Sequence, residues 1–161
     1  MFTHAWKLVL SLALLGVALA GASFAFASGG STASAMPQTF RVFDHTVRSH
    51  NIDVDNSHSF SIGDEFIFTD QLWTVDKSKR VGTLHGVCTV VSTSGNGVAH
   101  CVETAHLGTS TLEGSGDIDN SMKTFRQALV GGTGRYAGAS GQFVIHEISA
   151  NDAIVTVQFT D

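Results

Sequence analysis

The chain of 161 residues is long enough for one domain with a sizeable core and too short for two independent cores. Nine Lys and Arg against 14 Asp and Glu give a net charge of −5, a sign that disfavours nucleic acid as a partner. A hydrophobic content of 43% and a single Pro exclude a disordered acidic chain and a collagen-like or polyproline protein.

The N-terminus has the layout of a signal peptide. One Lys and no acid precede an almost unbroken apolar run from Leu8 to Ala20. Ala25-Phe26-Ala27 fits the small-x-small cleavage pattern, and Ala33-Ser34-Ala35 is a second candidate. We predict a signal peptide at 1–27 and a secreted protein with no stable membrane insertion after processing. The alternative is an uncleaved anchor, because the stretch from Leu8 to Ala27 is about long enough to span a bilayer.

The rest of the chain divides into a short linker and a β-rich domain. Residues 28–38 are small and polar and predict a flexible linker, so the domain is expected at 39–161. No stretch of the domain sustains a helical period, and Gly, Asn and Asp recur at strand-like intervals. The expected strands, in chain order, are 40–47, 65–73, 81–93, 98–107, 109–114, 122–130, 143–149 and 153–159.

Two features of these strands bear on the architecture. Along 65–73 the side chains alternate, so Phe66, Phe68, Asp70 and Leu72 share one face. Residues 94–97 read Ser-Gly-Asn-Gly and predict a hairpin, because Gly and Asn accept positive φ. Eight short antiparallel strands suit a closed barrel or a sandwich. We favour an all-β, eight-stranded antiparallel closed barrel, because closure removes exposed strand edges.

Four segments of the domain stand out as a set. They lie at 63–72, 80–82, 86–91 and 131–142 and read GDEFIFTDQL, RVG, GVCTVV and GGTGRYAGASGQ. In this order and spacing they resemble the allene oxide cyclase family, and the related dirigent proteins share the Gly-Asp start and the Gly-Gly-Thr-Gly turn. The resemblance extends over about residues 40–160.

The resemblance implies an eight-stranded barrel, commonly a homotrimer, with an apolar interior. Family members hold a reactive small molecule there so that ring closure or coupling gives one stereoisomer, which requires proximity and orientation more than acid–base chemistry. By position, Asp70 stands where the cyclases have a barrel-lining Asn, and Cys88 matches a lining Cys. Asp44 matches an acidic residue of the first strand. The Asp at 70 departs from the cyclases, whereas dirigent proteins place Asp in this stretch.

These positions define the predicted site. The expected catalytic residues are Asp70 and Asp44, and the expected ligand-binding residues are Phe66, Phe68, Leu72 and Cys88. Asp70 shares a face with apolar side chains, and a buried carboxylate needs a partner or a raised pKa, which marks a candidate for function. The plainer interpretations are a strand-end Asp facing water at 70 and a surface charge at 44.

The two cysteines are predicted to form a disulfide. A four-residue loop at 93–96 would place Cys88 and Cys101 directly opposite each other on the hairpin, facing the same side. An exported protein meets oxidising conditions, which favour pairing. Two buried, inert thiols are the alternative.

No metal and no cofactor are expected. His100, Cys101, Glu103 and His106 are close in sequence, but on a strand the two His share one face while Cys101 and Glu103 share the other. The acidic run at 53–56 reads as a polar loop, because His58 stands where a calcium-binding EF-hand requires Gly.

The expected partner is a small hydrophobic molecule, and two classes of function compete for it. One is an isomerase-like cyclase or stereo-directing protein. The other is a non-catalytic barrel that carries an apolar ligand, as lipocalins do. A barrel filled with side chains would instead be a structural module. Small residues expected on the inner face favour a cavity over that third reading: Gly86, Cys88, Ala99 and Ala105.

Overall fold

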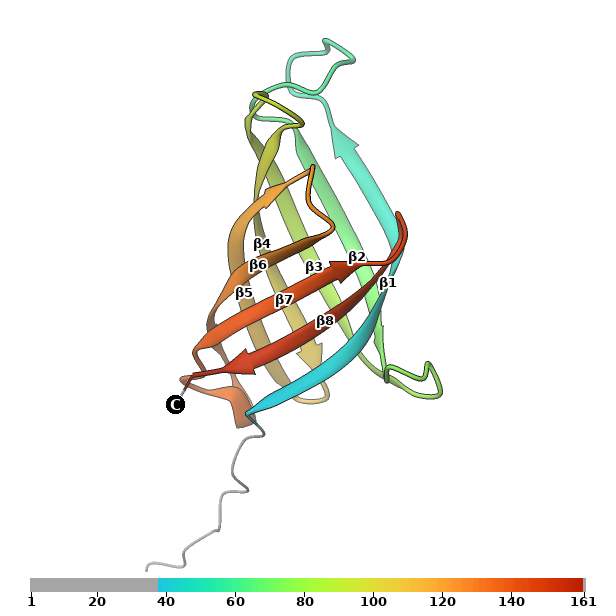
Figure 1. Cartoon of the computed structure of the whole chain (residues 1–161), viewed down its shortest axis with the longest axis vertical. Helices are drawn as coiled ribbons and strands as arrows, with labels where there is room; N and C mark the ends of the chain where they lie inside the picture. The colour runs from blue at the N-terminus through green and yellow to red at the C-terminus, as the bar shows by residue number, and fades with distance from the viewer. Residues whose placement is uncertain (1–37, 161) are drawn as a thin grey trace, which may run out of the picture. The chain divides into compact units, whose positions relative to one another are not determined.

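The computed structural model describes residues 38–160, which form a closed eight-stranded antiparallel barrel (Figure 1). Each strand pairs with the next one in the chain, and the first also pairs with the last. The predicted barrel is therefore confirmed, while the predicted signal peptide lies outside the described residues. The strands are β1 (Thr39–Ile52), β2 (Glu65–Trp73), β3 (Arg80–Ser92), β4 (Val98–Leu107), β5 (Ser110–Asp119), β6 (Thr124–Gly132), β7 (Gly141–Glu147) and β8 (Asp152–Phe159), and one 3-10 turn, η1 (Gly134–Tyr136), precedes β7.

Two strands run further than the sequence pattern predicts. β1 continues past Val47 because a bulge there absorbs one extra residue and pairing with β2 resumes. β5 continues through Gly114 and Gly116, where the sequence reads as a turn. A Cβ at 114 would lie 2.8 Å from the Phe143 ring. Glycine therefore makes room for inward side chains here and does not end the strand.

One end of the barrel is closed by a packed core. Tyr136 of η1 is 1% exposed, and its ring stacks on Phe159 and Phe40 with centroids 5.9 and 6.3 Å away. The core above this plug consists of aliphatic and aromatic side chains from the surrounding strands, namely Val42, Leu72, Leu84, Ala105, Leu112, Leu129, Phe143, Ile145, Val155 and Val157.

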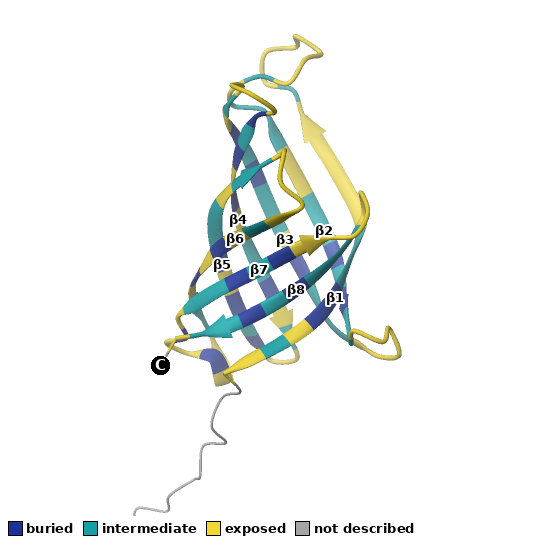
Figure 2. Cartoon of the chain, viewed as in Figure 1, coloured by how far each residue is buried: buried dark blue, intermediate teal, exposed yellow. Residues whose placement is uncertain are grey.

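The other end of the barrel is open. Because neighbouring strands are antiparallel, the loops at 53–64, 93–97, 120–123 and 148–151 all meet there. These loops are largely exposed, whereas buried positions follow the strands (Figure 2). Among residues 38–160, no helix is long and apolar enough to cross a membrane.

Candidate functional site

The open half of the barrel encloses a cavity of about 700 Å³. This volume lies in the range of sites that bind drug-sized ligands. Its walls are built from inward side chains of several strands, including Phe66 and Phe68 of β2, Ile118 of β5 and Phe125 of β6. A barrel filled with side chains along its whole length is therefore excluded.

The aromatic wall depends on a glycine across the sheet. Phe66 and Phe68 stack with ring centroids 5.7 Å apart. Gly86 lies directly opposite Phe68 on β3, and a Cβ at 86 would collide with the Phe68 ring. The absent side chain lets the ring lie against the strand and leaves the middle of the cavity open. Both predicted Phe residues thus line the cavity.

A disulfide joins Cys88 and Cys101, as predicted, and forms part of the cavity wall. The two residues are paired in the β3–β4 register. The loop is one residue longer than the predicted 93–96, because the register shifts between Val90 and Ser92. Since both sulfurs are bonded, Cys88 contributes an apolar cystine surface and no free thiol.

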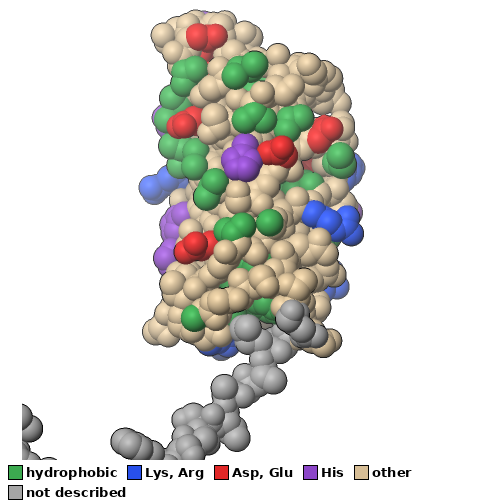
Figure 3. Space-filling view, turned by 90° about the vertical axis from the view of Figure 1, so that its left-hand side faces the viewer, with side chains coloured by type: hydrophobic (Ala, Val, Ile, Leu, Met, Phe, Trp, Pro, Cys, Tyr) green, Lys and Arg blue, Asp and Glu red, His purple; other side chains and the backbone are tan. Residues whose placement is uncertain are grey.

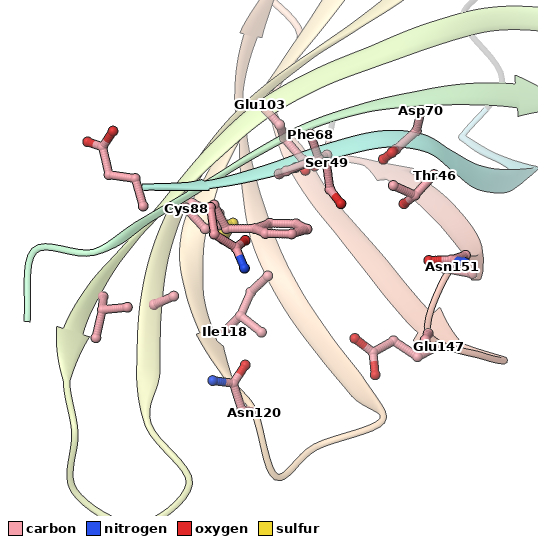
Figure 4. A pocket seen from close by; sticks show the side chains of 18 of the residues that line it. Thr46, Ser49, Phe68, Asp70, Cys88, Glu103, Ile118, Asn120, Glu147 and Asn151 are labelled. Atoms are coloured by element: carbon pink, nitrogen blue, oxygen red, sulfur yellow. A yellow bond between two sulfur atoms is a disulfide. The ribbon is translucent and has the colours of Figure 1, made fainter. Parts of the chain in front are cut away.

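Three carboxyl groups lie where the cavity meets the packed core. Asp44, Asp70 and Glu103 come from β1, β2 and β4 and all line the cavity. Figure 4 shows the Asp70 and Glu103 side chains directed into it. Asp70 is only 3% exposed, and Thr46 lies opposite it on β1, where the Thr46 hydroxyl favours the charged form of the carboxyl group and lowers its pKa. The Oδ1 atoms of Asp44 and Asp70 are buried without a hydrogen-bond partner. These three residues are called the acidic floor below.

Burial raises the pKa of every member of the acidic floor. For Asp44, burial and then the negative charges of Asp70 and Glu103 raise the pKa to about 8. A backbone hydrogen bond from His45 acts in the opposite direction and lowers this pKa. For Glu103, burial and the charge of Asp70 raise the pKa to about 7. Burial also raises the pKa of Asp70, opposed by the Thr46 hydroxyl. At neutral pH the floor therefore holds a protonated Asp44, able to donate a hydrogen bond, next to groups that accept one.

The bulge at Val47 determines which β1 side chains face this cavity. Thr46 pairs with Asp70, but Arg48 pairs with Thr69, so the inward alternation shifts by one residue. Ser49 and Asn51 line the cavity as a result, while Arg48 is exposed outside. Without the bulge, a guanidinium would face the acidic floor. Within residues 38–160, no Lys or Arg lines the cavity.

Acidic side chains also surround the mouth. Glu65, Glu147 and Asp152 line the upper part of the cavity, together with Asp53 and Asp64 of the loop after β1. The carboxyl oxygens of the two loop residues and of Asp55 come within 4.8 Å of one another. They accept backbone N–H bonds within the loop, such as Val54 and Ser61 to Asp64 and His58 to Asp53. These contacts organise a polar turn.

Other sequence-predicted residues lie away from the cavity. Leu72 is 2% exposed and belongs to the packed core, where it is paired with Asp44 in the β1–β2 register. His100 and His106 are exposed on the outer surface, whereas Cys101 and Glu103 of the same strand face inward, as the alternation predicts. His100 contacts Asp117 at 2.7 Å on the outside. The four residues therefore do not converge on one point.

Glu103 is the site residue that the sequence reasoning missed as a member of the cavity. From the sequence, Glu103 was considered only as a possible metal ligand. The alternation of side chains along the strand nevertheless places it on the same face as Cys101 and Ala105. Its partner in the β4–β5 register is Gly114, and a Cβ at that glycine would lie 3.1 Å from Glu103 Cγ. A glycine opposite an inward carboxylate leaves room for that side chain, and this pairing was the sequence feature that could have indicated that Glu103 lies in the cavity.

The family model of the allene oxide cyclase barrel-like domain matches residues 44–159. The chain belongs to this family. Among solved structures, a pyocyanin demethylase is similar at 23% identity and a TM-score of 0.69, covering 76% of this chain and 99% of the other. A pterocarpan synthase dirigent protein has 23% identity and a TM-score of 0.62 over 75% of this chain and 84% of its own.

A third similar structure is an exo-specific intermolecular Diels–Alderase, at 13% identity and a TM-score of 0.60 over 75% of this chain and 96% of the other. No curated protein matches the chain. At these identities the solved structures establish a shared barrel, which agrees with the sequence resemblance. A shared barrel does not determine the chemistry, which depends on the residues that line the cavity.

Proposed function

We propose that this barrel binds a small hydrophobic molecule that is already reactive and steers its cyclisation or its stereoselective coupling. The observation that carries the proposal is a drug-sized cavity with apolar walls above three inward carboxyl groups. A pure carrier of an apolar ligand has no use for buried carboxyl groups, which cost free energy. The similar dirigent protein and Diels–Alderase support the same class of function.

In the proposed mechanism the walls reduce the conformations that the substrate can adopt. Phe66 and Phe68 hold its apolar part, so that the reacting atoms meet in one relative orientation. Asp44, protonated at neutral pH, donates a hydrogen bond or a proton to a substrate oxygen as charge develops there. Where Asp44 gives up its proton, Asp70 or Glu103 accepts the proton that the protonated substrate releases as the product forms and returns it to Asp44. Where Asp44 only donates a hydrogen bond, no proton changes place.

The experiment combines a binding probe with a panel of reactive substrates. Displacement of the neutral dye N-phenyl-1-naphthylamine reports occupancy of the cavity. A triene, an allylic epoxide and a quinone methide report steering through the enantiomeric excess of their products. We expect one class to give a non-racemic product. Asp44→Asn and Asp70→Asn should each lower its rate by about 100-fold while dye affinity stays within about twofold.

Each outcome of this experiment decides between the competing functions. The matched control is Asp76→Asn, which removes an exposed acid at the closed end and should leave rate and binding unchanged. Dye binding with racemic products from every class would contradict steering and favour a lipocalin-like carrier. A barrel that does not bind the dye would contradict both functions.

We also propose that the protein is exported, supported by the signal-peptide layout and by the Cys88–Cys101 disulfide, which suits an oxidising compartment. N-terminal sequencing of the secreted protein should begin at Ser28, and a full-mass protein in the membrane fraction would favour the anchor. The homotrimer is a prediction of the family resemblance. Sedimentation equilibrium of the secreted protein tests it.

A further inference from the structure

The charges of this protein are unevenly distributed between its inside and its outside. More than half of its 14 acidic residues line the cavity or its mouth, namely Asp44, Asp53, Asp64, Glu65, Asp70, Glu103, Glu147 and Asp152. In the described residues, all Lys and Arg lie elsewhere. On the outer face in Figure 3, Lys and Arg side chains lie among hydrophobic, acidic and His side chains. A negatively charged funnel attracts cations to its mouth and concentrates them inside.

An independent observation comes from the acidic floor itself. Asp70 is 3% exposed, and its Oδ1 atom has no hydrogen-bond partner. Buried polar atoms are almost always paired, because an unpaired one costs free energy. Asp70 lines the cavity, so a ligand group that donates a hydrogen bond or carries positive charge would satisfy this oxygen.

The aromatic wall favours the same kind of ligand. Phe66 and Phe68 present stacked rings to the cavity, and Phe125 lines it from β6. The faces of aromatic rings attract cations, most strongly when water is excluded. A molecule with a flat apolar body and a positively charged group can therefore contact rings and carboxylates at the same time.

We propose that the cavity selects, among apolar molecules, those that carry a positively charged nitrogen, such as an arylalkyl ammonium or a quaternary ammonium compound. The apolar body lies against the Phe rings, and the cation lies at the acidic floor. The mouth residues Glu65, Glu147 and Asp152 speed its entry. This inference rests on the proposed function, because it names the substrate class of the same cavity.

The test compares two ligands of one shape. They are (biphenyl-4-ylmethyl)trimethylammonium and its neutral carbon isostere, 4-neopentylbiphenyl, each used to displace N-phenyl-1-naphthylamine from the secreted protein. At pH 8 and low salt the cation should bind about tenfold more tightly. In 0.5 M salt this preference should fall to about twofold, because salt screens the acidic mouth.

The outcomes separate this inference from the proposed function. Equal affinity of the two ligands, or tighter binding of the neutral one, overturns the cation preference and leaves an apolar cavity that can still steer a neutral substrate. Failure of both ligands and of the dye to bind overturns the inference together with the proposed function.

Variants locate the preference within the barrel. Glu103→Gln and Asp70→Asn should each lower the affinity of the cation about fivefold and leave the neutral isostere within about twofold. Glu113→Gln is the matched control, because Glu113 is exposed on the outer face of β5 and its loss changes the net charge equally. If Glu113→Gln lowers the cation affinity as much as Glu103→Gln does, net charge explains the preference and the assignment to the acidic floor is wrong.

Discussion

The two halves of the barrel are built from the same strands but from different side chains. In the closed half, large aliphatic and aromatic residues such as Leu112 and Tyr136 fill the interior. In the open half, inward positions carry Gly, Ala, cystine and carboxyl groups beside the Phe66 and Phe68 rings, and space remains between them. β2 shows the change within one strand, because Asp70 faces the cavity and Leu72, the next inward residue, belongs to the core.

The closed half of the barrel therefore supplies stability, and the open half supplies the groups that can contact a ligand. The closed half buries apolar surface, which is the dominant favourable contribution to folding. The open half leaves apolar surface unfilled and carries carboxyl groups at a cost in free energy. A cystine bridges two neighbouring strands in the open half, where packing is sparse.

The largest effect is expected at the closed end. Tyr136→Ala removes a ring that is 1% exposed and stacked on Phe40 and Phe159, so the free energy of unfolding should fall by about 3–5 kcal/mol. Urea unfolding of the secreted protein measures this. Phe60→Ala, at a mouth residue that is 52% exposed, should cost less than about 1 kcal/mol. Equal losses would show that the mouth is packed as tightly as the plug.

The disulfide should contribute the next largest amount. It closes a loop with a sequence separation of 13 residues, and a loop of this size corresponds to about 2–3 kcal/mol. The double variant Cys88→Ala, Cys101→Ala should therefore unfold at a lower urea concentration. Reductant should destabilise the wild-type protein by the same amount and leave the double variant unchanged. Unfolding of the wild type that is insensitive to reductant would show that packing alone holds the open half.

The acidic floor should make stability fall as pH rises. Asp44 and Glu103 have pKa values of about 8 and about 7 in the fold, raised from 3.8 and 4.5. The folded state therefore binds more protons than the unfolded chain between about pH 4 and pH 8, so the free energy of unfolding decreases over that interval. One pKa unit corresponds to about 1.4 kcal/mol, and water at the open mouth screens the charge. We expect Asp44→Asn to stabilise the protein at pH 8.5 by on the order of 2 kcal/mol.

Asp76, an acidic residue at the closed end, should show the opposite dependence of stability on pH. Asp76 accepts hydrogen bonds from Thr74 and Ser78 in an exposed turn, and these bonds lower its pKa. Its contribution is present above its unfolded pKa of 3.8 and is lost at lower pH. Asp76→Asn should therefore lower the free energy of unfolding at neutral pH, whereas Asp44→Asn should raise it. Urea unfolding at pH 4 and pH 8.5 separates the two signs, and the same sign for both would contradict the burial of Asp44.

The sequence predicted the side that a residue faces better than its depth along the barrel. Alternation placed Phe66, Phe68, Asp70 and Leu72 on one face, and this is correct, yet Leu72 lies beneath the cavity. Alternation has a period of two and carries no information on position along the barrel axis. The pairing of Cys88 with Cys101 could be predicted, because a hairpin turn determines the register of the strands next to it.

Long-range features were harder to predict. The bulge at Val47 lies in a stretch whose polar residues occupy both faces, so alternation alone ended the strand there. The role of Glu103 depends on Asp44 and Asp70, which come from other strands and are brought near it by the pairing of β1 to β4. Local pattern therefore determined the strands, while the acidic floor arises from the pairing of strands that are distant in sequence.

The smallest effect on stability is expected from Gly86→Ala, which tests how the open half keeps its space. The added Cβ would collide with the far end of the Phe68 ring, and that ring can swing into the cavity. The free energy of unfolding should therefore change by less than about 1 kcal/mol, whereas the affinity for N-phenyl-1-naphthylamine should fall about tenfold. Phe68→Ala in the Gly86→Ala background should restore dye binding, because the displaced ring is gone. Unchanged dye affinity in Gly86→Ala would mean that the ligand lies nearer the mouth, above Phe68, and that the glycine serves packing only.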